Sequence, residues 1–273
     1  MRSPSTLLGP LFALLLAMPG IAAAQDLRIE GLGDSRVLTA AQLRGRPDAS
    51  DILIPDDPVY HRDMHYRAVP LRSLLSGMAA DAHVQFVATD GFTGEVPARL
   101  IVDAGRTIGW LAIEPDGHPW PPVASGKPSA GPFYVVWTDP SAAGVGREQW
   151  PFQVATVRVT TNVDSRFPAM LPDPALPADA PARRGFAVFK KDCITCHTLN
   201  GQGDARLGPD LNIPHGPTEY LGTAYLKKLV RNPQELRHWP EAKMPAFDQR
   251  TLSDADLDDL VAYLSHMASS RSK

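Results

Sequence analysis

Two cysteines and a histidine stand together in the C-terminal half of the sequence. Cys193 and Cys196 are the only cysteines of the 273-residue chain, and His197 follows directly. Two thiols three residues apart on one helical turn can both add to the vinyl groups of one haem, and the next residue then carries an imidazole beneath the iron. The C-x-x-C-H pattern therefore predicts one covalently attached haem c, with His197 as an iron ligand.

Two other chemistries use closely spaced cysteines. A redox-active C-x-x-C pair needs a βαβ context, whereas this motif lies in a segment with helical periodicity. A zinc site needs about four ligands, usually from a second Cys or His pair at a suitable spacing. The chain has no further cysteine, so both alternatives fit the motif less well than haem does.

A haem iron also takes a ligand on its other face. Met244, in the stretch EAKMPAFDQ, stands before the last expected helix and is followed by a proline that stiffens the loop. His215, His238 and His266 are the competing candidates. Met/His ligation raises the reduction potential and leaves no open coordination position, which indicates electron transfer rather than oxygen or peroxide chemistry.

Three helices are expected around this motif. The apolar spacing and the prolines favour helices over residues 181–193, 218–233 and 252–270, with Asp179 capping the first and Ser253 capping the last. Asp256 would complete a capping-box variant with Ser253.

Residues from about Pro181 to Ser269 resemble the class I cytochrome c domain, an all-α fold. The matching features are the four-residue spacing of Gly185, Phe189 and Cys193, the tyrosine of VAYL (Tyr263), and the stretches GPDL, RNP and MPAF. The resemblance implies that Gly185 allows a close crossing of the first and last helices at Tyr263. It also implies that the Pro209 carbonyl accepts a hydrogen bond from His197. Trp239, Arg231 and Tyr220 are candidates to bond the haem propionates, with ordinary packing or solvation as the alternative.

The N-terminal part has a different pattern. Segments such as 82–92, 131–139 and 149–163 are rich in β-branched and aromatic residues between turn residues and predict strands, whereas 39–45 and 68–80 predict short helices, with Pro70 in the first turn of the second. Five prolines between residues 168 and 181 favour a stiff, extended linker. We therefore expect a mostly-β (α+β) domain at 25–164, a Pro-rich linker at 165–180 and the cytochrome c domain at 181–273.

The first 24 residues have the features of a secretory signal peptide. Arg2 is followed by an apolar stretch at 7–17 and by three alanines before Gln25. No later stretch approaches the ~20 apolar residues that span a bilayer. We expect an exported periplasmic protein with no integral membrane segment after cleavage.

The N-terminal domain also has a family resemblance. Segments 66–75, 84–97, 110–137 and 150–159 are similar, in that order, to the molybdopterin-binding domain of the sulfite oxidase family. That family holds molybdenum through a cysteine upstream of its VPL element, but no cysteine precedes Cys193 here. Where the family has a basic P-x-R, this chain reads Gly131-Pro132-Phe133-Tyr134. We expect no molybdopterin and interpret the domain as a docking module.

Other features leave alternatives open. His61, Asp63, Met64 and His65 of YHRDMHYR form a conceivable copper site or a solvated loop. Asp90, Glu95 and Asp103 suit turn or surface roles better than catalysis. Two functions are alternatives to a non-enzymatic electron carrier. The first is a molybdenum-type oxidoreductase that oxidises a small substrate such as sulfite, or the haem-containing subunit of such an enzyme. The second is a non-enzymatic assembly subunit that binds a metal or a partner.

The charge distribution differs between the two parts. Residues 25–174 hold 13 Lys and Arg against 18 Asp and Glu, a net charge of −5, whereas residues 175–273 hold 13 against 12, a net charge of +1. The acidic half suits a basic partner, and nothing indicates nucleic acid binding. The expected partner is a periplasmic redox protein or a membrane oxidase or dehydrogenase.

Overall fold

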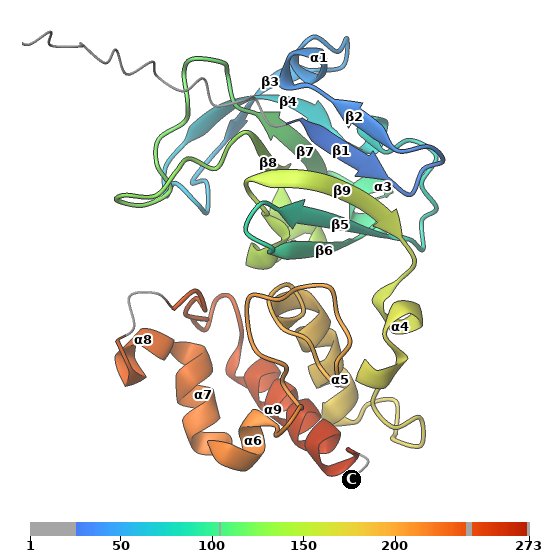
Figure 1. The fold of residues 1–273 in the computed structure, drawn as a ribbon, viewed down its shortest axis with the longest axis vertical. Helices are drawn as coiled ribbons and strands as arrows, with labels where there is room; N and C mark the ends of the chain where they lie inside the picture. Colours follow the sequence, from blue (N-terminus) through green and yellow to red (C-terminus); the bar gives the residue numbers. More distant parts are fainter. Residues whose placement is uncertain (1–25, 104, 239–241, 272–273) are drawn as a thin grey trace, which may run out of the picture.

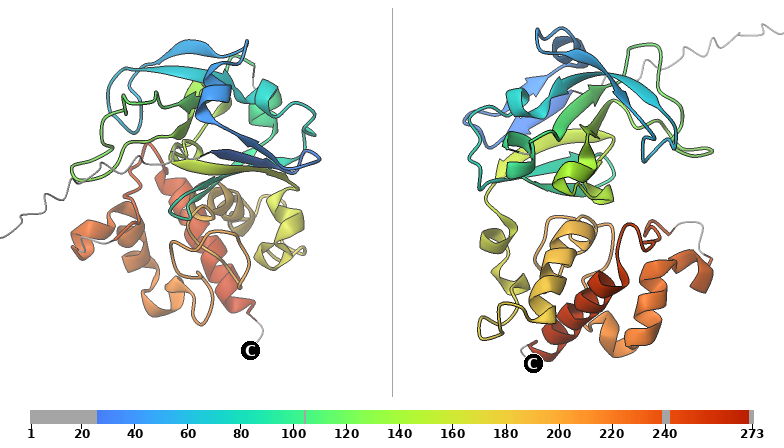
Figure 2. Two further views of the ribbon diagram at one scale, coloured as in Figure 1. Left: turned by 45° about the horizontal axis from the view of Figure 1, so that its top comes forward. Right: turned by 180° about the vertical axis from the view of Figure 1, so that it is seen from behind.

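The computed structural model describes residues 26–103, 105–238 and 242–271. The expected signal peptide and Trp239 lie outside these ranges. Within them, no helix is both long enough and apolar enough to cross a membrane. Figures 1 and 2 show a β-rich part stacked on a helical part. We call residues 26–160 the β region and residues 163–271 the helical region.

The β region is built from two sheets. The first has the order β2-β1-β9-β5-β6, with β1 and β9 parallel and the other neighbours antiparallel, and the second has the antiparallel order β3-β4-β7-β8. The strands are β1 (Leu27–Glu30), β2 (Arg36–Leu38), β3 (Ser50–Ile54), β4 (Met64–Pro70), β5 (His83–Ala88), β6 (Thr93–Pro97), β7 (Ile108–Ile113), β8 (Phe133–Thr138) and β9 (Val154–Thr160).

One apolar core lies between the two sheets. Phe86 and Val157, paired across β5 and β9, and Leu111 and Val135, paired across β7 and β8, are all fully buried in it. Short helices α1 (Ala40–Arg44), α2 (Leu71–Leu74) and α3 (Arg99–Val102) link the strands. The expectation of a mostly-β N-terminal part is confirmed. The helix expected over 68–80 is much shorter, because Pro70 ends β4 and only the following turn is helical.

The helical region holds α4 (Val163–Arg166), α5 (Pro181–Val188), α6 (Pro217–Tyr220), α7 (Thr223–Arg231), α8 (Pro233–Leu236) and α9 (Asp254–Ser269). Ser253 caps α9 as expected, since its hydroxyl accepts from the Asp256 amide at 3.1 Å. The residue before α5 is Ala180 rather than Asp179, and no side chain caps that helix. The single helix expected over 218–233 is divided into α6 and α7, because Gly222 takes a φ of 73° that a continuous helix cannot contain.

The proline-rich segment, expected as a stiff, extended linker, belongs to the helical region. Its backbone contains α4 and a 3-10 turn at Pro168–Met170. Val163 and Met170 are fully buried in the core of the helical region. The Tyr263 hydroxyl of α9 also donates to the Met170 carbonyl at 2.6 Å. The prolines prevent a long helix, as expected, but Val163 and Met170 are buried in the same core as the apolar residues of α9.

The crossing of α5 and α9 fixes the helix that leads to the cysteines. A Cβ added at Gly185 would lie 1.9 Å from the Asp259 carbonyl oxygen and 2.7 Å from Tyr263 Cβ, so only glycine allows this approach. Tyr263 then packs against Phe186 and Phe189, with ring centroids 5.4 and 5.5 Å apart. The close crossing implied by the resemblance is present in the structure.

Gly185→Ala tests this crossing. The added methyl group forces the backbones of α5 and α9 apart, and we expect the free energy of unfolding to fall by about 1–3 kcal/mol, despite the better helix propensity of alanine. Ala187→Ser, which also adds one heavy atom but on the exposed face of α5, is the control and should change stability little. Denaturant titration of the haem-loaded protein measures both, and equal stability of the two variants would contradict the prediction.

Candidate functional site

The end of α5 presents both cysteines on one turn. After Val188 the helix widens into a π-helical turn at Phe189–Cys193, in which the Ile194 amide donates to the Phe189 carbonyl at 3.0 Å. The amides of Cys196 and His197 then both donate to the Cys193 carbonyl, at 3.1 and 3.0 Å. Such π-turns occur often at functional sites. Here the π-turn and the turn at residues 194–196 that follows it bring Cys193, Cys196 and His197 together, as the motif requires.

The imidazole of His197 is held from one side. Its Nδ1 lies 2.8 Å from the Pro209 carbonyl oxygen, so the ring carries its proton there and leaves the Nε2 lone pair for a metal. Burial lowers the pKa of His197, and the Pro209 hydrogen bond only partly offsets this. The neutral imidazole that binds iron is therefore the favoured form. This is the contact that the resemblance implied for Pro209.

Gly208 allows the Pro209 loop to approach this ring. A Cβ at Gly208 would lie 2.3 Å from His197 Cε1 and 2.8 Å from Nε2. The Gly208 amide also donates to the Cys196 carbonyl at 2.8 Å, which ties the loop to the motif. The resemblance of GPDL to the family implied a role for Pro209 alone. The steric role of its glycine appears only when the ring is in place.

The thiols of Cys193 and Cys196 form no disulfide with each other, and both are in the protonated form. Burial, followed by the nearby Asp192 carboxylate, raises the pKa of Cys193 well above its usual value. Burial also raises the pKa of Cys196 to about 11. Thiols of redox-active C-x-x-C pairs have lowered pKa values, so these two lack that property. With the free Nε2 of His197, they fit the attachment of haem c.

Met244 lies in the loop between α8 and α9. Its side chain is half-buried against the core of the helical region. The loop is anchored by the Phe247 amide, which donates to the Val230 carbonyl at 3.1 Å. The position therefore suits a ligand carried on a stiff loop, and the role of Met244 at the iron stays a prediction.

Arg231 anchors the same loop. Its guanidinium donates to the carbonyls of Phe247 and Leu252, at 2.9 and 2.6 Å, and to the Asp254 carboxylate at 2.6 Å. These bonds give Arg231 a structural role in holding the Met244 loop, and its suggested propionate contact stays a prediction. Tyr220, the other described candidate for that contact, is 61% exposed.

The three competing histidines have different surroundings. His266 Nε2 accepts a hydrogen bond from the Asp173 amide at 3.0 Å, so this atom is engaged within the protein. His215 and His238 are exposed. In YHRDMHYR, Met64 is buried in the β core, whereas His65 is exposed on the other side of β4. Among the described residues, no group of three or more His, Cys, Asp or Glu side chains could hold a metal ion.

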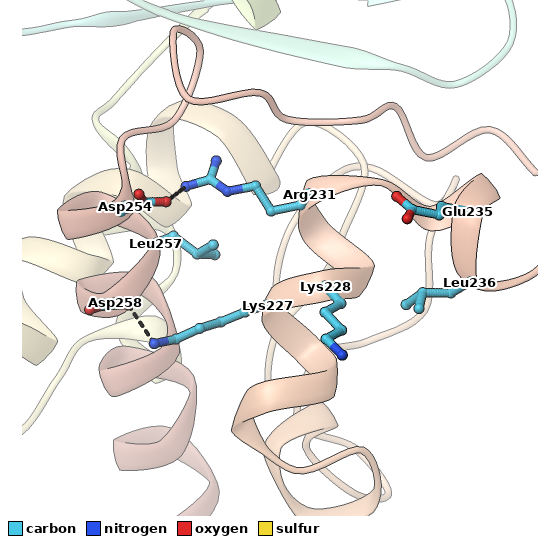
Figure 3. A pocket seen from close by; sticks show the side chains of 8 residues that line it. All are labelled: Lys227, Lys228, Arg231, Glu235, Leu236, Asp254, Leu257 and Asp258. Atoms are coloured by element: carbon cyan, nitrogen blue, oxygen red, sulfur yellow. Dashed lines mark hydrogen bonds and ion pairs between the residues drawn. The ribbon is translucent and has the colours of Figure 1, made fainter.

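A pocket of about 580 Å³ opens between α7, α8 and α9 (Figure 3). The ion pairs Arg231–Asp254 and Lys227–Asp258, at 2.6 and 2.5 Å, cross it from α7 to α9. Its lining contains neither of the cysteines nor a predicted iron ligand. The remaining lining residues are Lys228, Glu235, Leu236 and Leu257. We assign no role to this pocket.

Carboxylates from both regions approach the cysteine segment. Burial raises the pKa of Asp192 to about 6, against the opposing effect of Lys191. Burial, followed by the charge of Asp192, raises the pKa of Glu148 to about 7. Glu148 belongs to a 3-10 turn, Arg147–Gln149, of the β region. Sequence spacing gave no sign of this approach, because the two residues are 44 positions apart.

The raised pKa of Glu148 predicts a pH dependence of stability. A group whose pKa is higher in the folded state stabilises the fold while protonated, and this contribution is lost as the pH rises from the usual value of 4.5 towards 7. Glu148→Gln should therefore make the fall in unfolding free energy over this range shallower. Denaturant titrations at several pH values measure the slope, with the exposed Glu235→Gln as control. A slope equal to that of the control would contradict the prediction.

Gly208→Ala tests the fit around His197. The methyl group would overlap the imidazole, and we expect a displaced ring, a changed absorption spectrum of the ferric haem and a lower yield of haem-loaded protein. Gly216→Ala is the matched control, because its Cβ would meet atoms no closer than 3.1 Å at an ordinary φ of −72°. A wild-type spectrum and yield for Gly208→Ala would show that the loop does not need this glycine.

A comparison with protein-family models identifies part of the chain. The cytochrome c family model matches residues 182–268, which include both cysteines, His197, Pro209 and Met244. A search among curated proteins found no match. The matched family implies covalent haem c and a role in electron transfer, and it agrees with the geometry at His197. Residues 182–268 of this chain are therefore a cytochrome c domain.

Proposed function

We propose that the protein is an exported electron carrier with one haem c. The hydrogen bond between His197 Nδ1 and the Pro209 carbonyl, at 2.8 Å, is the observation that carries the proposal, because it prepares a neutral imidazole directly after two attachment cysteines. The haem, when bound, supplies an Fe(II)/Fe(III) couple that takes up and releases single electrons. The cytochrome c match supports this role.

Four residues of the chain are proposed to hold the haem. Cys193 and Cys196 would attach the haem, and His197 and Met244 would be its iron ligands. With two protein ligands, the haem would supply one-electron exchange rather than the binding of oxygen or peroxide. Trp239 is proposed to bond a propionate, and it lies outside the described residues.

The β region is proposed as a docking module. Its resemblance to the molybdopterin-binding domain of the sulfite oxidase family stands on the sequence segments alone, and the cysteine that holds molybdenum in that family has no counterpart here. Fold does not determine function, so such a domain can serve a different role. We expect it to contribute to contacts with a periplasmic redox protein or a membrane oxidase or dehydrogenase.

The periplasmic location rests on the N-terminal sequence and on the family. The first 24 residues have the pattern of a signal peptide. Cytochrome c domains are typically extracytoplasmic. Export would also explain covalent attachment, since an exported protein cannot easily recapture a lost cofactor.

Metal analysis separates this function from its alternatives. Protein purified from a periplasm competent in haem attachment should contain one iron per chain, without molybdenum or copper. About one molybdenum per chain would instead support an oxidoreductase whose β region oxidises a small substrate such as sulfite. Stoichiometric copper would support a metal-binding assembly subunit, with YHRDMHYR as the segment to test.

Met244→Ala tests the second iron ligand. Loss of the thioether should lower the midpoint potential, abolish the absorption band of the Met–Fe(III) bond and allow added imidazole to bind the iron. Met78→Ala in the β region is the control, because Met78 packs against the other core. A retained Met–Fe(III) band in Met244→Ala would show that another residue binds the iron.

A further inference from the structure

The β region packs directly on the segment that carries the cysteines. The amide of Thr93, at the start of the edge strand β6, donates to the carbonyl of Thr195 at 3.2 Å. Thr195 stands between the two cysteines and is 1% exposed. Lys191 lies against the backbone at Gly146, where an added Cβ would be 2.5 Å from Lys191 Cε. The cysteine-bearing face of the helical region is therefore covered, and Figure 1 shows β5 and β6 above the helical region.

Charged groups hold the two regions together. Arg166 of α4 donates to Glu95 of β6 and to Asp204 of the helical region, both at 2.6 Å. The Glu95 side chain is only 3% exposed, so the expected surface role is wrong, and the arginine supplies the cation that its buried charge needs. Gln85 of β5 also donates to the Asp204 carboxylate. Arg166 thus connects both sides of the interface.

A second pair lies at the border of the interface. Lys243, directly before Met244, is 3.7 Å from Asp90 in the turn between β5 and β6, and both side chains are exposed. The helical region therefore presents Arg166, Lys191 and Lys243, which we call the basic face. The β region presents Asp90, Glu95 and Glu148 to it, and Glu148 meets the like charge of Asp192. Asp192 and Asp204 also lie on the helical side, where Arg166 neutralises the charge of Asp204.

We infer that the β region occupies the basic face as an internal acidic partner, and that an external redox partner with an acidic surface competes for the same face. This inference rests on the proposed function, which makes the helical region an electron carrier. Electron transfer weakens steeply with distance. A layer of protein over the cysteine-bearing face therefore hinders exchange through that face until the β region moves aside.

The chemistry of the interface suits such a movement. Polar interfaces between domains usually permit relative motion, unlike large apolar ones. The Asp90–Lys243 pair is exposed and is screened by salt. A partner that binds only the open form shifts the population towards it by mass action.

Two variants open the interface in different ways. Arg166→Ala removes the cation that joins Glu95 and Asp204, and Asp90→Lys replaces an attraction to Lys243 by a repulsion between exposed side chains, which does not endanger folding. We expect the rate constant for reduction of the ferric haem by ascorbate to rise roughly tenfold in Arg166→Ala and roughly two- to fivefold in Asp90→Lys. Hydrogen exchange of the Thr93 amide should also become faster in both.

Each variant has a matched control. Asp51→Lys makes the same charge change on β3 at an 83% exposed side chain paired with Arg67, and Arg46→Ala removes an arginine whose ion pair with Asp48 lies within the β region. Poly-L-glutamate serves as the acidic probe. At low salt it should bind Asp90→Lys more tightly than Asp51→Lys, although the two proteins have equal net charge.

The outcomes separate this inference from the proposed function. A wild-type protein without haem, or without a reversible one-electron couple, would refute the electron-carrier role itself. With that couple present, rates, Thr93 exchange and poly-L-glutamate affinities equal to those of the controls would overturn the inference alone. Faster reduction and exchange in both opening variants, with tighter probe binding by Asp90→Lys, would establish the internal partner.

Discussion

The close approach of α5 and α9 at Gly185 is the constraint on which the rest of the helical region depends. With no Cβ between Gly185 and the Asp259 carbonyl, the two helices cannot slide without losing the packing of Tyr263 against Phe186 and Phe189. This crossing fixes the direction in which α5 delivers the cysteines. The imidazole of His197 and the loop at Gly208 are then placed by short backbone connections to the same turn.

Sequence reasoning succeeded where the signal is local. The Cys-x-x-Cys-His spacing, the Ser253 cap and the apolar stripe of α9 each lie within a few turns of helix, and each is present in the structure. The division of α6 from α7 was missed because a glycine inside a helical pattern is usually tolerated, and only its positive φ reveals the break. The contacts of Met170, Glu95 and Arg166 join residues far apart in sequence, and no spacing rule predicts them.

Arginines illustrate the limit of assigning roles by residue type. Arg231 was a plausible partner for a propionate, yet its guanidinium bonds two carbonyls and a carboxylate around the Met244 loop. Arg166 had no expected role, yet it bonds a buried carboxylate of the β region and an aspartate of the helical region. A guanidinium offers five donors in a rigid fork and can join several acceptors at once. Which acceptors it meets depends on the tertiary fold.

The docking of Met170 beneath α9 also bears on where the helical region begins as a physical unit. A fragment starting at Pro181 would contain the whole of α5, but it would lack Val163 and Met170 from its core and would leave the Tyr263 hydroxyl without its acceptor. A fragment starting at Asn162 keeps all three contacts and also retains the side-chain cap of α4. The boundary set by packing, at Asn162, therefore precedes the one suggested by helix periodicity, at Pro181, by 19 residues, and the proline-rich stretch belongs to the haem-bearing unit.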